Sequence, residues 1–368
     1  MRIMMAITSL NFGGAETQII NLSKELVTQG HQVLLVSLSN DVPRIVELEG
    51  THVEIIIEHK KRKLDFSVIK NMRSHIKKWQ PDIVHGYLYD AEFYCRLAGI
   101  NTSIPIINSE RNDNYQFNLN QRIGHYLTAK MTDAVIANSY AGQAFAKKRY
   151  HHLKDNRINV VWNGIDTKKI KHRLAQCTTH YKYELFGTDK VKIACMVAAI
   201  KPQKDYTLAL QVANELVESD DQWRVIFLGD KLTVSNDDYK NTITDQYNNL
   251  KNKDKIVFLG NRTDVIELLS QADVSFLTSH HEGFPNAVLE SMSVGTPCIT
   301  TNFSDIKKIA IAPWMIIENR QPLDFVQAIN KAADEKPNLS NQSITWVNEN
   351  CALDVIAKKL VDTYNTYL

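Results

Sequence analysis

The chain has 368 residues, of which 44% are hydrophobic and 23% charged, and its formal net charge is +2. This length predicts about two domains of roughly 150 residues each, with enough apolar side chains for real cores. A charge so close to zero gives no strong positive field, which argues against a nucleic-acid partner.

The cysteine content and the N-terminus bear on the compartment. Five cysteines are scattered along the chain, with no CxxC pair and no Cys/His metal spacing, which fits a reducing environment. Residues 1–14 read as a first strand rather than as a signal peptide. No run of about 18 apolar residues is present, so no membrane-spanning segment is expected. These features predict a cytoplasmic protein.

Two local clusters of basic residues stand out, HKKRK at 59–63 and KKRYHHLK at 147–154. Each fits either a solvated face or a surface attracted to anionic lipid headgroups. Near a membrane surface each cation adds about 1 kcal/mol of attraction. An anionic inner-membrane surface is therefore a candidate partner, with peripheral attachment to the inner face of the cell membrane.

Strands and helices alternate along the first half of the chain. Residues 2–10 predict a buried strand, residues 15–29 place apolar side chains at helical spacing, and residues 31–39 predict the next strand. Such a βαβ unit has parallel strands and a right-handed crossover. Further strands are expected at 53–57, 82–88, 104–109, 133–139 and 158–164.

A second alternation begins near residue 191. Strands are expected at 191–200, 223–230, 255–261, 273–279 and 297–302, with a helix at 206–218. The fold class is therefore α/β, with two doubly wound Rossmann-like domains in tandem. The domains are expected at 1–168 and 169–351, and the last helix, about 352–368, is expected to pack back on the first domain. Ligands of such sheets bind beyond the carboxyl ends of the strands.

The segment HEGFPNAVLE (281–290) follows one of these strands and places an acidic residue on each side of a helix start. Pro285 suits the first turn of that helix. Free N–H groups at a helix start favour an anion, and carboxylates beside it can accept hydrogen bonds from hydroxyls. Glu282 and Glu290 therefore fit a nucleoside diphosphate sugar. The alternative is that Glu282 is a surface loop residue and that Glu290 only complements the helix dipole.

Longer motifs extend this pattern. EGFPNAVLESMSVGTPCITTN (282–302) resembles the E-x7-E segment of the GT4 family of retaining glycosyltransferases (glycosyl transferases group 1), which have the two-domain GT-B fold. SLNFGGAETQIINLSKEL (9–26) resembles the glycine-rich loop of that family, VVWNGID (160–166) its domain-crossing motif, and KPQKD (201–205) its lysine loop. The resemblance implies two domains facing across a cleft, the first binding the acceptor and the second the nucleotide sugar.

Carried over position by position, the resemblance implies a role for each matching residue. Glu290 would bind the ribose hydroxyls of the donor, and Glu282 the hydroxyls of the transferred sugar. Lys204 would neutralise the diphosphate. Gly13 and Gly14 would let their loop approach the same diphosphate, unless they form only a tight turn. The other donor-binding candidates are Gly283, Phe284, Pro285, Asn286, Ala287, Lys201 and Arg262.

The chain departs from the family pattern at the lysine loop. Ala198 and Ala199 stand where the family has Gly-Arg, so one cation that pairs with the phosphates is missing. Loss of such a charge-assisted contact typically costs about 1.5–3 kcal/mol. Lys201 is a candidate replacement.

Arg111 and His85 are the catalytic candidates of the first domain, beside Glu282 and Lys204 in the second. Arg111 stands where many relatives carry a histidine near the reacting sugar, and its alternative is a surface arginine paired with Glu110 or Asp113. His85 lies at a strand end, where site residues gather, and its alternative is a structural hydrogen bonder.

The resemblance implies a retaining reaction on one face of the sugar, in which the departing phosphate takes the acceptor's proton. No DxD-like metal pattern stands at a suitable place, so neither a metal nor a cofactor is expected. The expected donor is a UDP-sugar, although no residue distinguishes uridine from guanosine. The expected acceptor is a glycan, such as a polyprenyl-diphosphate-linked saccharide in O-antigen or capsule assembly.

Competing functions make different demands on the sequence. A nicotinamide- or flavin-dependent oxidoreductase would need GxGxxG after a strand, which the chain lacks. A sugar-nucleotide epimerase or phosphorylase of related fold stays open. A non-catalytic glycan- or nucleotide-sugar-binding scaffold on the same fold also stays open, and Ala199 is the residue that favours it.

Overall fold

The computed structural model describes residues 1–111, 117–232 and 237–368. The chain forms two compact units: unit 1 holds Met1–Gly164 with Cys351–Leu368, and unit 2 holds Ile165–Asn350. The chain thus leaves unit 1 at Gly164 rather than at residue 168, and it returns to unit 1 at Cys351. No helix within the described ranges is long and apolar enough to cross a membrane.

Unit 1 is built on a seven-stranded sheet of order β3-β2-β1-β4-β5-β6-β7, in which each paired strand is parallel to its neighbour. The strands are β1 (Arg2–Ile7), β2 (Gln32–Ser37), β3 (Glu54–Ile57), β4 (Ile83–Tyr87), β5 (Ile106–Glu110), β6 (Ala134–Ala137) and β7 (Ile158–Val160). The central strands are buried on both faces, which accounts for the almost continuous apolar runs of β1 and β2.

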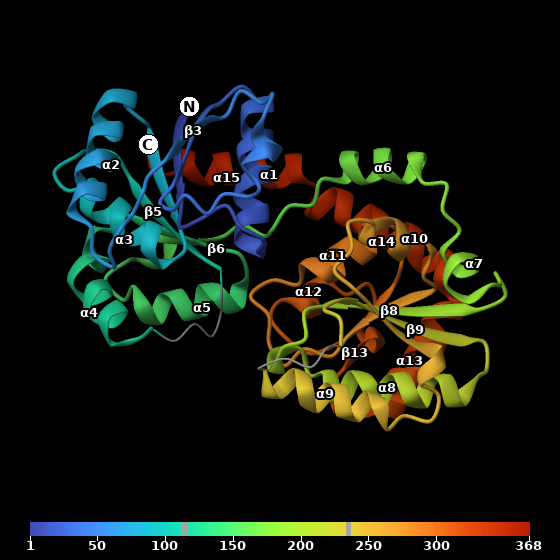
Figure 1. Cartoon of the computed structure of the whole chain (residues 1–368). Helices are drawn as coiled ribbons and strands as arrows, with labels where there is room; N and C mark the ends of the chain where they lie inside the picture. Colours follow the sequence, from blue (N-terminus) through green and yellow to red (C-terminus); the bar gives the residue numbers. More distant parts are fainter. Residues whose placement is uncertain (112–116, 233–236) are drawn as a thin grey trace. The chain divides into compact units, whose positions relative to one another are not determined.

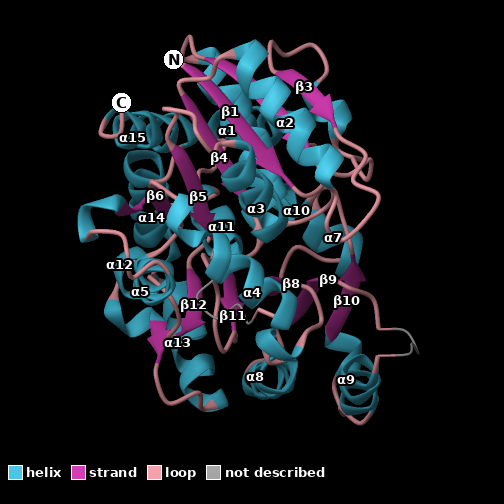
Figure 2. Ribbon diagram, turned by 90° about the vertical axis from the view of Figure 1, so that its left-hand side faces the viewer, coloured by secondary structure: helices cyan, strands magenta, loops and turns pink. Residues whose placement is uncertain are grey.

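Helices cover both faces of this sheet (Figure 2). They are α1 (Gly14–Thr28), α2 (Phe66–Trp79), α3 (Tyr89–Ala98), α4 (Leu119–Thr128), α5 (Tyr140–Arg149) and α15 (Leu353–Asn365). The C-terminal helix α15 packs against α1, as Figure 1 shows. Short 3-10 helices are η1 (Ile45–Leu48), η2 (Ala129–Met131) and η3 (Asp155–Arg157).

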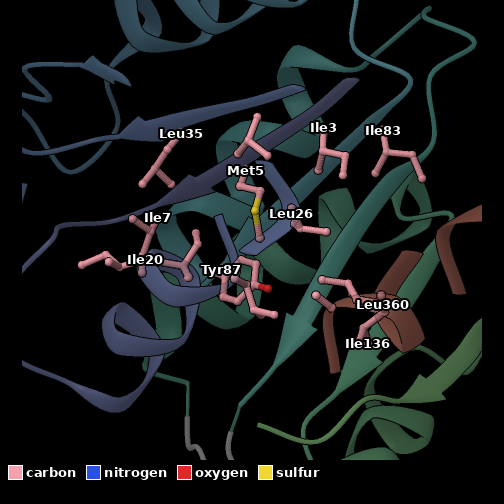
Figure 3. Close-up of a cluster of buried hydrophobic side chains, with 14 of the residues drawn as sticks. Ile3, Met5, Ile7, Ile20, Leu26, Leu35, Ile83, Tyr87, Ile136 and Leu360 are labelled. Carbon is pink, nitrogen blue, oxygen red and sulfur yellow. The ribbon is translucent and has the colours of Figure 1, made fainter. Parts of the chain in front are cut away.

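Alternate side chains of β1 enter different cores, as the two-residue period of a strand requires. Ile3, Met5 and Ile7 join the cluster of Figure 3, to which α1 contributes Ile20 and Leu26 and to which α15 contributes Leu360. Met4 and Ala6 point to the opposite face and pack with residues of α2 and α3. The C-terminal helix is therefore part of the core of unit 1.

Unit 2 holds a six-stranded sheet of order β10-β9-β8-β11-β12-β13, again with parallel pairs. Its strands are β8 (Lys192–Ala198), β9 (Trp223–Gly229), β10 (Ile256–Gly260), β11 (Val274–Leu277), β12 (Cys298–Thr301) and β13 (Ile316–Ile317). Its helices are α6 (Thr167–Gln176), α7 (Tyr181–Phe186), α8 (Tyr206–Ser219), α9 (Asp238–Asn248), α10 (Val265–Gln271), α11 (Asn286–Ser293), α12 (Ile306–Ile309), α13 (Pro322–Asp334) and α14 (Lys336–Asn350), with 3-10 helices η4 (Pro202–Lys204), η5 (Lys253–Lys255) and η6 (Pro313–Met315).

The strand order of each sheet reverses at one point. In unit 1 this point lies between β1 and β4, and in unit 2 between β8 and β11. Loops that leave neighbouring strands there run in opposite directions and open a crevice at the carboxyl edge, where doubly wound folds bind ligands. In unit 2 the two loops are the lysine loop after β8 and the Glu282 loop after β11, so the topology brings these distant segments together.

Candidate functional site

The carboxylate of Glu282 is the centre of a buried polar cluster at the switch point of unit 2. The residue is only 7% exposed. Its Oε1 accepts hydrogen bonds from the Lys204 ammonium and from Ser279 Oγ, the latter at 2.6 Å. Glu282 is therefore no surface loop residue. Its charge is fixed in place by a cation and a hydroxyl from two different loops.

Hydrogen bonds to backbone carbonyls join these two loops. Thr278 Oγ1 donates to the carbonyls of Lys204 and Asp205 at 2.8 and 3.1 Å, and the N–H of His280 donates to the carbonyl of Gln203 at 2.8 Å. The Gln203 amide returns a bond of 2.7 Å to the carbonyl of His281. Such a network holds both side chains of the Lys204–Glu282 pair before any ligand arrives.

Arg320 belongs to the same cluster, although sequence reasoning did not single it out. It follows β13, and its Nη2 donates to Asp205 Oδ2 at 2.6 Å and to the carbonyl of Thr278 at 2.8 Å, while Nη1 reaches the carbonyl of Ser279 at 3.1 Å. Asp205 has a left-handed backbone (φ +48°) and caps α8. Arg320 therefore stabilises an unusual turn directly after Lys204.

The predicted helix start is present as α11, which begins at Asn286. Pro285 occupies the N-cap rather than the first helical position, and no side chain caps the helix from there. Phe284 is buried, and the carbonyl of Gly283 accepts a 3.1 Å bond from Ser304 Oγ. The segment Gly283–Ala287 thus places backbone N–H groups at a helix N-terminus beside Glu282.

Glu290 lies about one turn into α11, and its carboxylate has no hydrogen bond or ion pair to any residue that the structure describes. Removal from water raises its pKa to about 7, against the lowering effect of the Arg173 charge. Arg173 is itself committed to Glu267, with N···O distances of 2.8 and 2.6 Å. The Glu290 carboxylate therefore takes no part in the neighbouring ion pair of Arg173 with Glu267 and can accept hydrogen bonds from a ligand.

Arg262 and Lys201 stand apart from this cluster. The Arg262 guanidinium is bound to Asp264 by two hydrogen bonds of 2.7 and 2.6 Å, and Asp264 also accepts from Tyr181 at 2.8 Å. Lys201 is exposed, and only its backbone carbonyl takes part in the loop, accepting from the N–H of Lys204. The structure does not bring either side chain to Glu282 or Glu290 by a hydrogen bond.

The glycine candidates Gly13 and Gly14 begin α1 in unit 1, after β1 at its own switch point. Gly13 has an extended backbone (φ −164°), and a Cβ there would meet only the end of the Glu16 side chain. No backbone strain forces glycine at this position.

The two candidates of unit 1 lie in one buried cluster. Arg111 Nη2 donates to Asn163 Oδ1 at 2.9 Å, and its guanidinium lies 5.3 Å from the ring centroid of Tyr87. His85 is fully buried, with Nδ1 2.6 Å from the Tyr364 hydroxyl of α15. Burial and the neighbouring Arg111 charge lower the pKa of His85 to about 3, so the ring is neutral.

These contacts bear on the alternatives for both residues. The prediction that His85 lies at a strand end is wrong, because it is the third of the five residues of β4 (Ile83–Tyr87). It makes the structural hydrogen bond of the alternative interpretation. Glu110, one of the two partners considered for Arg111, accepts instead from Arg149 Nη1 at 2.7 Å. Asp113, the other partner considered, lies outside the described residues. Within those residues no group of three His, Cys, Asp or Glu side chains is placed to hold a metal ion.

Comparisons with known proteins agree with this architecture. Residues 182–345 match the family model of glycosyl transferases group 1, and residues 12–169 match that of glycosyltransferase family 4. Over 291 residues, covering 74% of this chain and 73% of the relative, the chain is 27% identical to the UDP-Gal:alpha-D-GlcNAc-diphosphoundecaprenol alpha-1,3-galactosyltransferase of Escherichia coli.

Solved structures give the same fold over the whole chain. A glycosyltransferase from Rickettsia africae ESF-5 superposes with a TM-score of 0.84 at 18% identity, covering 99% of this chain and 98% of that one. Anabaena Alr3699/HepE in complex with UDP gives a TM-score of 0.83 at 16% identity, with both chains fully covered. The two family models together span most of the sequence, and the chain belongs to the GT4-type glycosyltransferases with the GT-B fold.

Proposed function

We propose that the protein is a retaining glycosyltransferase that moves a sugar from a UDP-sugar to a lipid-linked saccharide, without a metal ion. The observation that carries this proposal is the arrangement at the switch point of unit 2. The ion pair of half-buried Lys204 with buried Glu282 lies on one side of the α11 N-terminus, and a carboxylate without a described hydrogen-bond partner, Glu290, lies on the other.

Each part of the arrangement suits one part of the donor. Glu290 accepts from the ribose hydroxyls, and the N-terminus of α11 faces the diphosphate. The Lys204 ammonium has three donors and gives one to Glu282, so the others remain for a phosphate oxygen. Glu282 holds hydroxyls of the transferred sugar.

Catalysis then consists of positioning and of charge stabilisation at the departing diphosphate. The acceptor hydroxyl attacks the anomeric carbon from the face that the phosphate leaves, and the leaving phosphate oxygen takes its proton. Glu282 is not assigned as a nucleophile, because its Oε1 is already held by Lys204 and Ser279. Lys204 and the helix N-terminus supply the positive charge that a metal gives in other transferases.

Unit 1 would bind the acceptor, and a polyprenyl-diphosphate-linked saccharide of O-antigen or capsule assembly is the proposed class. The relative from Escherichia coli acts on a diphosphoundecaprenol-linked sugar, which supports this choice. The proposed place of work is the cytoplasmic face of the membrane, where such acceptors are anchored.

The test is calorimetric titration with UDP, GDP and ADP, each in EDTA and in Mg²⁺. The proposal expects one nucleotide, UDP, to bind equally well in both. Nuclear magnetic resonance of the product from a UDP-sugar and an added acceptor then reads the anomeric configuration, which must match that of the donor.

A non-catalytic scaffold on the same fold is the second candidate, and the specific observation for it is Ala199 in the place of the family's arginine. A scaffold would bind UDP-sugar but neither transfer nor hydrolyse it. Release of UDP from the donor during prolonged incubation therefore separates the two functions.

A further inference from the structure

Helix α4 presents a continuous apolar face to solvent. Leu119, Ile123, Tyr126 and Leu127 are exposed by 70%, 51%, 84% and 65%. They recur at three- and four-residue spacing, so they share one side of the helix. A solvated helix on the surface of a domain carries polar side chains at such positions. No other described helix of this length exposes so many large apolar side chains.

The side of α4 that faces unit 1 is instead small and polar. A Cβ on Gly124 would come within 2.4 Å of the Tyr89 hydroxyl oxygen, and this hydroxyl donates to the carbonyl of Gln121 at 3.0 Å. His125 packs edge-on against the ring of Tyr150, with centroids 4.9 Å apart. A rotation of α4 that buried its apolar side would break these contacts. The contacts with unit 1 therefore fix the orientation in which the apolar side faces solvent.

The same outward side carries positive charge. Arg122 is exposed beside Ile123, and exposed Lys130 in η2 follows at helical spacing from Tyr126 and Leu127. Helix α4 contains no aspartate or glutamate. Apolar side chains flanked by cations are the pattern of a helix that lies in the plane of an anionic lipid surface.

The basic segment 59–63 contacts helix α3, the helix against which α4 also packs. Figure 1 shows α3 between α2 and α4, and both neighbours pack against it. Lys60 pairs with Asp90, and the N–H of Asp65 donates to the Tyr94 hydroxyl at 2.8 Å, while Tyr89 meets α4. The first turns of α3 therefore join the two segments.

Two exposed apolar side chains end that basic segment. Leu64 follows Lys63 directly, and Phe66 follows Asp65; the two apolar side chains are 46% and 73% exposed. The segment 59–66 thus also places apolar groups next to cations, and its one carboxylate, Asp65, accepts hydrogen bonds from the Lys61 N–H and from Ser67.

We propose that α4 docks on an anionic lipid surface, with Leu119, Ile123, Tyr126 and Leu127 inserted among the acyl chains and Arg122 and Lys130 at the headgroups. The segment 59–66 makes a second contact. This inference deepens the proposed function, because it assigns the membrane contact mainly to a helix face that the sequence clusters 59–63 and 147–154 did not include. The occupant is a membrane rather than a protein because every charge on the exposed helix face is positive.

The test is co-sedimentation of the full-length protein with vesicles that contain phosphatidylglycerol, and with vesicles of phosphatidylcholine alone. Wild-type protein should bind the anionic vesicles. The variant Leu119→Ser/Ile123→Ser/Leu127→Ser should lower the partition coefficient by about tenfold or more. The matched control is Val46→Ser/Tyr183→Ser/Leu323→Ser, which removes side chains of similar exposure, 60%, 63% and 61%, elsewhere and should bind as wild type.

A second measurement does not depend on the fold of the triple variant. Tyr126→Trp should shift its fluorescence to the blue on addition of anionic vesicles and be quenched by brominated acyl chains, whereas Tyr183→Trp should not. Absence of this shift, or full vesicle binding by the α4 triple variant, overturns the proposal.

Two further outcomes are distinct. If sedimentation velocity without lipid shows an oligomer that the triple variant abolishes, a second copy covers α4 and the membrane assignment is wrong. If the protein binds vesicles through α4 but binds no nucleotide in calorimetry, the docking surface stands and the proposed transferase function fails.

Discussion

The two sheets have the same kind of switch point, but their candidate residues differ in how many hydrogen-bonding groups remain available for a ligand. In unit 2, the switch point presents Lys204 with spare donors and Glu290 without any described partner. In unit 1, both candidates are turned inward: His85, inside β4, is bound to Tyr364, and Arg111, directly after β5, is bound to Asn163. The proposed donor site thus has groups available for a ligand, whereas His85 serves the packing of α15. If unit 1 binds the acceptor as proposed, recognition depends on groups other than His85, and Arg111 is the remaining candidate there.

The largest effect in this comparison is expected at Lys204. Lys204→Ala should lower kcat/KM by about 10²–10³, since it removes the ammonium from the leaving diphosphate and leaves buried Glu282 without its cation. Steady-state kinetics with the donor varied will measure this loss.

Lys201→Ala is the matched control, because Lys201 lies on the same loop but is exposed. A loss below about threefold would show that it carries no phosphate charge. An equally large loss in both variants would instead mean that Lys201 replaces the missing arginine of the family.

Glu290 allows the proposed donor site to be tested through the pH dependence of nucleotide binding. Its carboxylate has a pKa of about 7 without ligand, and hydrogen bonds from ribose hydroxyls favour the charged form. Nucleotide affinity should therefore rise from pH 6 to pH 8, and protons should be released on binding below pH 7. Calorimetry in buffers of different ionisation enthalpy will measure both.

Glu290→Gln should flatten this profile and weaken binding by about tenfold or more. Glu282→Gln is the contrasting variant, and it should impair transfer more than the binding of free UDP. A wild-type profile that is already flat would refute the role of Glu290 at the ribose.

The difference between the two edges also shows what a sequence can predict. The two parallel-sheet domains follow from the alternation of apolar strands and amphipathic helices, whereas the strand orders and switch points come from the structure. Glu282, Glu290 and Lys204 could be singled out as candidates because short motifs carry them. Arg320 could not, since it bonds to Asp205 over a separation of 115 residues and no local pattern marks it. His85 was ambiguous for the same reason, because its partner Tyr364 is 279 residues away.

Helix α4 escaped prediction for a different reason. Its apolar spacing is that of a helix packed on a core, yet Gly124 and the Tyr89 hydroxyl hold the opposite side against the domain. Only the tertiary contacts reveal that the apolar side points to solvent. Periodicity predicts that a face is apolar, not what covers it.

Arg320 should show an intermediate effect and act through position rather than through contact with the donor. Arg320→Ala frees Asp205 and the carbonyls of Thr278 and Ser279, so the lysine loop loses its lateral support. We expect kcat to fall by about tenfold, with a smaller change in UDP affinity and about 1–3 kcal/mol less stability. Arg320→Lys should recover part of kcat, as a positioning role requires.

Arg224→Ala is the control for Arg320, because Arg224 also donates to backbone carbonyls, those of Asp221 and Trp223, but does so at the start of β9, at the amino edge of the sheet. It should lose some stability and keep kcat. Equal losses of kcat in both variants would show that stability alone explains the effect.

The smallest effect on activity is expected at His85, where the effect falls on stability instead. The folded-state pKa of about 3 lies below the unfolded value of 6.5, because burial and Arg111 oppose protonation. Between these values the unfolded chain binds the extra proton, so this contribution to stability is complete above pH 6.5 and is lost as the pH falls toward 3, by up to about 1.4 kcal/mol per pH unit. His85→Gln keeps a hydrogen-bonding group near Tyr364 but does not titrate, so denaturant unfolding at pH 7 and pH 5 should show a smaller loss than in the wild type. A variant that unfolds as the wild type does at both pH values, but has lost transfer, would return His85 to the catalytic candidates and remove the contrast between the two edges.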